Sequence, residues 1–224
     1  MVNLSFNASF ATAEDWQSVL AECLKNLDNT AQGSNFGFLY ITDPLAPYLN
    51  QLLEELRTQT GVDDWIGTVG AGICYTGTEI YDEPAAAILL TTLPEDSYRL
   101  VPAGMNALTD MLSENRDWIA EQAVHFGIVH GDPRNTHIAQ LIESLSAELD
   151  PGFLVGGLTS ASDSSFQQQV AGDIYEDGLS GVLLSSQISV VSGLTQGCTP
   201  LETRHTITRA EGNILAEIDG RPAL

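Results

Sequence analysis

The sequence predicts an α/β protein made of two copies of an α-β-α-β-β unit, with mixed β-sheets flanked by helices and an antiparallel three-strand segment at the carboxyl end. Short strand-like apolar runs alternate with amphipathic helical patterns, and these elements recur in the same order at a nearly constant offset. The first unit covers about residues 11–98, the second about 99–186, and the unpaired C-terminal segment 187–224. We expect these parts to form one domain, 1–224.

An amphipathic helix opens each unit. Its apolar residues recur every three or four positions, which places them on one face of a helix. They are Trp16, Val19, Leu20, Cys23, Leu24 and Leu27 in the first unit, and Met105, Leu108, Met111 and Leu112 in the second.

A buried strand and a second helix follow in each unit. The strands are Phe36–Tyr40 and Phe126–His130, whose first residues are 90 positions apart. An Asp-Pro pair follows each strand, at Asp43 and at Asp132, and predicts a helix start with Asp as the N-cap. Apolar residues at helical spacing continue to Leu56 and Leu145.

Glycine-rich strands and a Tyr-acid-acid turn complete each unit. Gly67–Gly72 stands beside Phe153–Gly157, and Glu79–Pro84 beside Asp173–Gly178. The acidic pairs in these turns lead into apolar strands, 86–92 and 180–186, and we interpret them as solvated turns rather than catalytic carboxylates.

The C-terminal segment predicts three antiparallel strands, Ile188–Gln196, Thr203–Arg209 and Ile214–Ile218. The sequence Glu211-Gly212-Asn213 predicts the turn between the last two. The polar loop Thr159–Gln169 has no apolar rhythm and is the best candidate for a mobile lid.

The charge of the chain excludes several classes of function. It has 224 residues with 8 Lys and Arg against 30 Asp and Glu, a net charge of −22. Nucleic acid and anionic membranes are excluded as partners, because both require clustered cations. The sequence also lacks a signal-peptide pattern and a long apolar run, and its three cysteines lie far apart. We therefore expect a cytoplasmic protein.

Two clusters invite a catalytic or metal-binding interpretation. His125, His130, Asp132 and His137 lie close in sequence, but His130 and His137 stand where the first unit has aromatic residues, so we expect ordinary packing or surface histidines and no metal or cofactor. Cys198 lies in a Gly-Cys-Thr-Pro turn, and a thiol enzyme using Cys198 with His205 remains an alternative.

We expect a ligand pocket where the glycine-rich strand ends meet the turn at residues 196–200. The glycines either permit close approach between the two units or line this pocket. The candidate ligand-binding residues are Gly70, Gly72, Gly156, Gly157, Thr159, Ser160, Gln196, Gly197, Cys198 and Arg204.

Four motifs mark the carboxyl-terminal part of the chain: Gly181–Ser186, Gln196–Pro200, Thr208–Ile214 and Glu217–Leu224. Together they resemble the FIST family of F-box and intracellular signal transduction proteins, and the likeness to the N-terminal FIST region covers about residues 30–224. Thr199 replaces an arginine that the family often carries, and relatives continue into a C-terminal FIST region.

The resemblance implies a sensory domain of signalling proteins that binds small molecules such as amino acids, with a fused output domain or a signalling partner. Our first expectation is a cytoplasmic, non-catalytic ligand-sensing domain. The alternatives are a protein-interaction scaffold that uses the acidic surface or a sheet edge, and the Cys198-dependent thiol enzyme.

Overall fold

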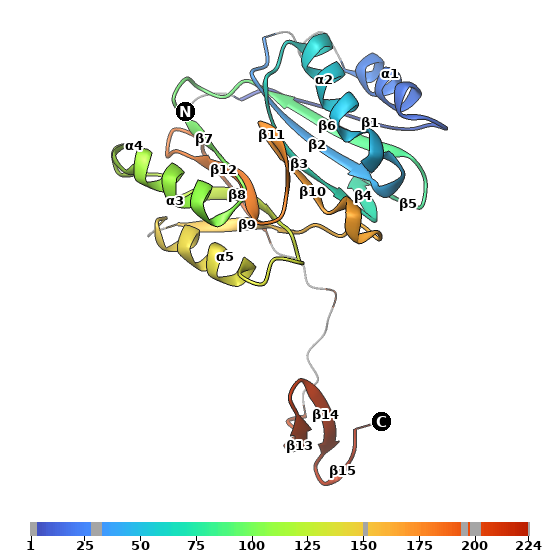
Figure 1. Cartoon of the computed structure of the whole chain (residues 1–224), viewed down its shortest axis with the longest axis vertical. Coiled ribbons are helices and arrows are strands. Elements are labelled where there is room, and N and C mark those ends of the chain that lie inside the picture. The colour runs from blue at the N-terminus through green and yellow to red at the C-terminus, as the bar shows by residue number, and fades with distance from the viewer. Residues whose placement is uncertain (1–3, 28–32, 150–151, 194–196, 198–202, 224) are drawn as a thin grey trace. The chain divides into compact units, whose positions relative to one another are not determined.

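A computed structural model of the chain describes residues 4–27, 33–149, 152–193, 197 and 203–223. The chain divides into two compact units, Met1–Val190 and Val191–Leu224, which are described separately here. Both termini, the α-helices and the strands named below are marked in Figure 1.

The larger unit alternates strands and helices. Its helices are α1 (Trp16–Asn26), the 3-10 helix η2 (Asp43–Tyr48), α2 (Leu49–Thr60), α3 (Met105–Glu114), α4 (Arg116–Glu121), α5 (Ile138–Ala147) and the 3-10 helix η3 (Ser164–Phe166). Its strands are β1 (Phe6–Thr12), β2 (Phe36–Thr42), β3 (Asp64–Gly70), β4 (Gly72–Tyr75), β5 (Thr78–Tyr81), β6 (Ala85–Thr91), β7 (Tyr98–Val101), β8 (Phe126–Gly131), β9 (Phe153–Leu158), β10 (Gln168–Ala171), β11 (Asp173–Glu176) and β12 (Leu179–Leu184).

The strands form two main sheets. The six-stranded sheet has the order β1-β6-β2-β3-β10-β11, and the four-stranded sheet has the order β7-β12-β8-β9. In each sheet a parallel pair, β2 with β3 or β8 with β9, adjoins antiparallel partners. The hairpin β4–β5 forms a separate two-stranded sheet.

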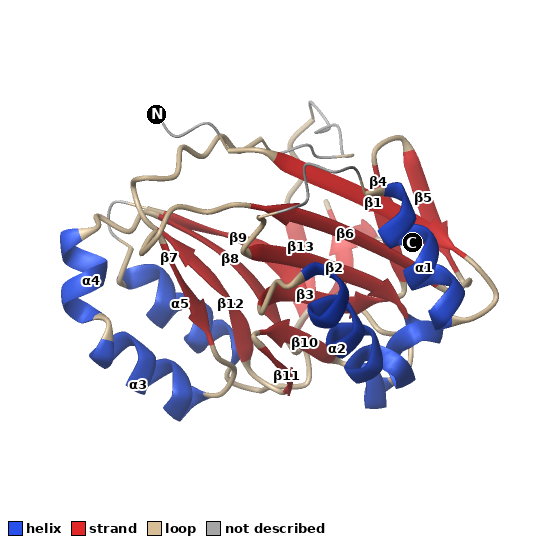
Figure 2. Cartoon of the chain, turned by 90° about the horizontal axis from the view of Figure 1, so that it is seen from above, coloured by secondary structure: helices blue, strands red, loops and turns tan. Residues whose placement is uncertain are grey.

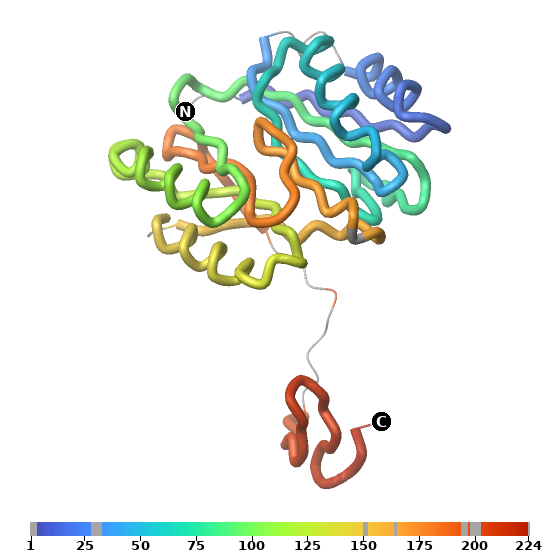
Figure 3. Tube along the Cα trace, viewed as in Figure 1, coloured from blue at the N-terminus to red at the C-terminus, as the bar shows by residue number. Residues whose placement is uncertain are grey.

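The β10–β11 hairpin crosses from the later half of the chain to the earlier sheet. β10 pairs antiparallel with β3, and the Thr68 hydroxyl donates to the Gln168 carbonyl oxygen at 3.0 Å. The orange trace of this hairpin runs beside the blue and cyan strands in Figure 3. The six-stranded sheet is therefore completed by residues about 100 positions downstream of β3.

Three apolar clusters arrange these elements in layers. One joins α1, η2 and α2 to the six-stranded sheet, a second joins α3, α4 and α5 to the four-stranded sheet, and a third lies between the sheets. Figure 2 shows the two groups of helices beside their respective sheets. We call the face of the six-stranded sheet that points away from α1 and α2 its inner face.

Local sequence explains where α1 begins and how it packs. The Asp15 side chain accepts a hydrogen bond from the Ser18 backbone N–H at 2.8 Å, which satisfies an otherwise unpaired donor of the first turn. Val19, Leu20 and Cys23 are buried against the sheet, as the helical spacing predicts.

The prediction of a mixed α/β fold with a C-terminal antiparallel three-strand sheet is confirmed. Each half also has strands that the prediction lacked, β1 with β4–β5 and β7 with β10–β11. The segment 188–193 contains no strand, because Ile188 donates its backbone N–H to Ser185 in a turn and is buried in the cluster between the sheets. Residues 194–196 of that predicted strand lie outside the described residues.

Asp132 has a different role from the helix cap that the sequence predicts. Helix α5 begins at Ile138, and the buried Asp132 carboxylate accepts hydrogen bonds from Arg134 and from the Asp177 backbone N–H. Burial alone would raise the pKa of Asp132, but the hydrogen bonds and charge of Arg134 lower it below its ordinary value. The carboxylate therefore links the end of β8 to the turn before β12 by a hydrogen bond.

Replacing Asp132 by Asn is expected to lower the free energy of unfolding by about 1–3 kcal/mol at pH 7, because charge-assisted hydrogen bonds are lost. The carboxylate's stabilisation is complete above its unfolded pKa and disappears as the pH falls through the lowered folded pKa. Urea unfolding at several pH values measures the effect. The exposed Asp110→Asn variant is the control, and an equal loss in both variants would contradict this role.

The smaller unit contains the three-stranded sheet β13 (Ile207–Glu211), β14 (Ile214–Ile218) and β15 (Arg221–Pro222). Its first turn contains Gly212 at φ 60°, which confirms the predicted turn after Glu211. Asp219 accepts a hydrogen bond from the Thr206 backbone N–H and pairs with the His205 ring, with 2.6 Å between Oδ2 and Nδ1.

No helix within the described ranges has the length and apolar character that a bilayer crossing requires.

Candidate functional site

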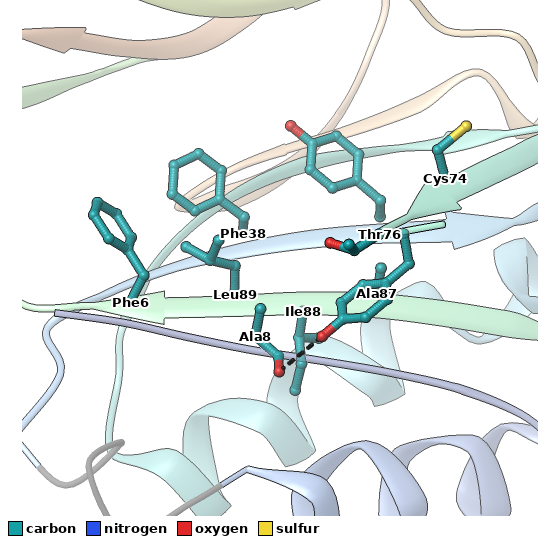
Figure 4. Close-up of a pocket in the computed structure, with 10 residues that line it drawn as sticks. Phe6, Ala8, Phe38, Cys74, Thr76, Ala87, Ile88 and Leu89 are labelled. Carbon is teal, nitrogen blue, oxygen red and sulfur yellow. Dashed lines mark hydrogen bonds between the residues drawn. The ribbon is translucent and has the colours of Figure 1, made fainter. Parts of the chain in front are cut away.

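An apolar cavity lies on the inner face of the six-stranded sheet (Figure 4). Its volume is about 360 Å³, which is within the range of small-molecule sites. β1, β2 and β6 supply most of its walls, and β4 with the turn after it supplies the rest. The lining residues are Phe6, Ala8, Phe38, Tyr40, Cys74, Tyr75, Thr76, Ala87, Ile88 and Leu89.

The alternation of β1 explains why this sheet face is apolar and accessible. Asn7 and Ser9 point toward the helix side and are buried, whereas Phe6 and Ala8 point to the inner face and are exposed. Phe6 is 59% exposed. Apolar side chains on the exposed face of a strand are unusual where that face contacts only water. Exposed apolar patches of this kind mark binding sites.

The β4–β5 hairpin closes one side of the cavity. Ile73 and Ile80 of the hairpin are buried against Ala85 and Ala87 of β6. The Tyr75 hydroxyl donates to the Ala8 carbonyl oxygen at 3.1 Å, which ties the hairpin to β1. Figure 4 shows the thiol of Cys74 and the hydroxyl of Thr76 at this end of the cavity.

Tyr40 connects the cavity to the four-stranded sheet. Its Oη lies 3.2 Å from Nε2 of His130 on β8, and the two rings meet edge to face with centroids 5.5 Å apart. His130 is only 4% exposed. The two sheets thus meet through a polar contact at the edge of an otherwise apolar site.

Burial sets the protonation states of this pair. It lowers the pKa of His130 to about 4 and raises the pKa of Tyr40 to about 12. At neutral pH the imidazole and the phenol are therefore both uncharged. The pair can donate and accept hydrogen bonds, but it offers no charge to a ligand.

The structure brings together some of the sequence-predicted site residues. Gly70 forms an isolated parallel bridge with Ser160, and the Ala71 backbone N–H donates to the Ser160 carbonyl oxygen at 3.0 Å. Thr159 beside them is buried and bonded to Gly131. The Gly72 Cα faces the Tyr81 ring, which leaves no space for a Cβ.

The remaining predicted residues belong to other parts of the chain. Gly156 and Gly157 belong to the exposed strand β9, at the edge of the four-stranded sheet. Gly197 and Arg204 are exposed residues of the smaller unit. Gln196 and Cys198, and with them the proposed thiol chemistry of Cys198, fall outside the described residues. None of the predicted residues that the structure describes in the larger unit lines the cavity around Tyr40.

The loop proposed as a mobile lid is held at several points. The Ser162 backbone N–H donates to Asp43 at 2.7 Å, and the Gln167 side chain donates to the Ala161 carbonyl oxygen at 2.7 Å. Asp163 begins the 3-10 helix η3 by accepting from the Ser165 backbone N–H. The segment is therefore held by hydrogen bonds and buried residues, whereas its polar composition predicts an open, mobile loop.

Two signals for the cavity were present in the sequence. The alternation of Phe6, Ala8 and Phe10 marks a strand with one apolar face. Tyr40 and His130 occupy the same position of two similar strand sequences, 90 residues apart. Neither signal was used in the predictions above, in which the start of the chain indicates only the absence of a signal peptide and His130 is only a packing or surface residue.

Comparison with known proteins identifies a family for most of the chain. Residues 35–221 match the model of the FIST N domain. An uncharacterized protein of Mycobacterium tuberculosis, Rv0628c, is 31% identical over 164 residues, covering 71% of this chain and 41% of the relative. An uncharacterized protein of Mycobacterium bovis, Mb0898c, is 28% identical over 190 residues, covering 82% of this chain and 46% of the relative. The chain thus spans less than half the length of these relatives.

Proposed function

Because the chain belongs to the FIST N domain family, we propose that it is the small-molecule-sensing domain of a signal-transduction protein, and that its ligand occupies the cavity around Tyr40. The observation that carries this proposal is the cavity itself, because a volume of about 360 Å³ with apolar walls and few polar groups is typical of ligand sites. The proposed role is non-catalytic and requires no cofactor.

The position of the cavity supports a sensing role. It lies against β1, β2 and β6, and Tyr40 at its margin contacts His130 of the other sheet. A ligand that contacts Tyr40 would therefore change a group that both sheets share. We propose that this contact transmits binding to an output domain or a signalling partner.

We also propose that the two halves of the larger unit are copies of one ancestral unit. The orders β1-β6-β2-β3 and β7-β12-β8-β9 correspond strand by strand. Leu39 stands opposite Gly67 in the first parallel pair, as Val129 stands opposite Gly156 in the second. This register aligns Gly156 with Gly67.

A thermal-shift screen with neutral, zwitterionic and anionic compounds, including the amino acids, tests the sensing proposal. A true ligand at 100 times its Kd is expected to raise the Tm by about 5–10 °C. Replacing Ala8, an exposed residue of β1 whose small side chain lines the cavity, by Trp fills the space and is expected to abolish the shift. Ala147→Trp, on the exposed end of α5, is the matched control and is expected to keep it.

Alkylation of Cys74 provides a readout that does not depend on stability. Cys74 is exposed and lines the cavity, whereas Cys23 is buried and its pKa is raised to about 12 by burial, so its thiol stays protonated and inert. In a Cys198→Ser background, a ligand in the cavity is expected to slow alkylation of Cys74. A ligand that raises the Tm equally in both Trp variants and leaves Cys74 unprotected would place binding elsewhere and contradict the proposal.

A further inference from the structure

The hydrogen bonding of His130 determines what Tyr40 can offer to a ligand. Neutral His130 has a single N–H, on either Nε2 or Nδ1. Nε2 faces Tyr40 Oη, whereas Nδ1 is buried and has no hydrogen-bond partner among the described residues. The two tautomers therefore leave different groups unpaired.

The tautomer protonated at Nε2 is the favourable one. A proton on Nδ1 would leave a buried N–H without an acceptor, and such groups are among the rarest in folded proteins. A proton on Nε2 is instead donated to Tyr40 Oη, and only an acceptor at Nδ1 is left unpaired. The Tyr40 hydroxyl then accepts from His130 and keeps its own O–H free to donate.

The other lining residues offer no charged partner to a ligand. The ten residues around the cavity include no Lys, Arg, Asp or Glu, and the neighbouring His130 is uncharged at neutral pH. An ionised carboxylate or ammonium group that enters such a site loses its hydration and gains no opposite charge. A free amino acid carries both charges and fits these walls poorly.

We propose that the ligand is an uncharged, largely apolar molecule that carries a hydrogen-bond acceptor oxygen, such as a ketone, ester or amide, which accepts the O–H of Tyr40. This inference deepens the proposed function and rests on it. It differs from the amino-acid ligand that the family resemblance implies, because the polar groups of the lining side chains, among them the hydroxyls of Tyr40 and Thr76 and the thiol of Cys74, are neutral, whereas a zwitterion requires two charged partners.

Four small aromatic probes separate these classes: acetophenone has the acceptor oxygen, ethylbenzene lacks it, benzoate carries a negative charge, and phenylalanine is a zwitterion. We expect acetophenone to bind about 2- to 10-fold more tightly than ethylbenzene, the effect of one neutral hydrogen bond. Benzoate and phenylalanine are expected to bind at least about 10-fold more weakly than acetophenone. Ligand-observed NMR titration measures the affinities, and protection of Cys74 from alkylation places each probe in the cavity.

Tyr40→Phe removes only the hydroxyl and is the decisive variant. It is expected to lower the affinity for acetophenone to that for ethylbenzene, and to leave ethylbenzene binding unchanged. Tyr81→Phe is the matched control, because Tyr81 is 57% exposed and does not line the cavity. Circular dichroism and the Tm of both variants show whether the fold is retained.

The possible failures are distinguishable. If phenylalanine or benzoate protects Cys74 better than acetophenone, or if Tyr40→Phe does not change the preference for acetophenone, the ligand class is wrong while the cavity remains a binding site. If no probe protects Cys74, the cavity is not a site for small molecules, and the proposed function fails together with this inference.

Discussion

Replacing Gly67 by alanine is expected to lower the free energy of unfolding by about 3–5 kcal/mol, among the largest effects of a single substitution in this protein. Gly67 lies in β3, directly opposite Leu39 of β2. A Cβ built on Gly67 falls 1.7 Å from the Leu39 carbonyl oxygen, so β2 and β3 would have to separate. Because β3 lies between β2 and β10 in the six-stranded sheet, it cannot move away without breaking other pairing.

Gly157→Ala is the control for Gly67→Ala. It is also a strand glycine, but a Cβ on Gly157 meets no atom within 4 Å. We expect its free energy of unfolding to change by less than about 1 kcal/mol. The direction favours stability, because alanine has fewer backbone conformations than glycine in the unfolded chain. Urea denaturation of both variants with circular dichroism measures the difference. Equal stabilities would show that β2 and β3 tolerate separation, and that the close approach at Gly67 is not a constraint.

Acidification is expected to destabilise the protein by about 3 kcal/mol through His130 alone, since one pKa unit corresponds to about 1.36 kcal/mol. Burial lowers the pKa of His130 from 6.5 to about 4 in the folded state. Between these two values the unfolded chain takes up a proton that the folded protein excludes, so stability decreases as the pH falls. Above pH 6.5 both states are neutral at this residue and its contribution is constant.

The variant His130→Gln isolates this effect from the many carboxylates, which are common to both proteins. Its free energy of unfolding is expected to fall less steeply than that of the wild type between pH 7 and pH 4. The difference in free energy of unfolding between the two proteins should therefore change by about 3 kcal/mol over this range. His137→Gln, at an exposed histidine before α5, is the control and is expected to keep the wild-type slope. Parallel curves for wild type and His130→Gln would mean that His130 titrates normally in the folded protein.

The local elements were predictable because each depends on nearby residues. Asp15 and the apolar spacing after it define α1, and the Gly-Asn turn after Glu211 defines the hairpin of the smaller unit. Long-range pairing was not predictable. The sequence contains both Thr68 and Gln168, but nothing local indicates that their strands pair, because that depends on which sheet edges are left open.

The cavity around Tyr40 was not predicted, for a related reason. The sequence prediction rests on glycines, which mark close backbone approach as readily as ligand contact: Gly156 lies against Val129 of its own sheet. The cavity is instead defined by side chains of β1, β6 and β2, strands that are adjacent only in the folded sheet. His130 belongs to the candidate site only through its contact with Tyr40, which lies 90 residues earlier in the sequence.

The position of the β10–β11 hairpin has a consequence for how the chain is made. A nascent polypeptide that has emerged only as far as β6 contains β1, β2, β3 and β6 but lacks β10, the strand that covers the outer edge of β3. Until the ribosome has added that hairpin, the edge can pair with another chain, a common origin of aggregation. Synthesis of the earlier half alone should thus yield a protein that depends on chaperones, and coexpression of the later half should relieve that dependence.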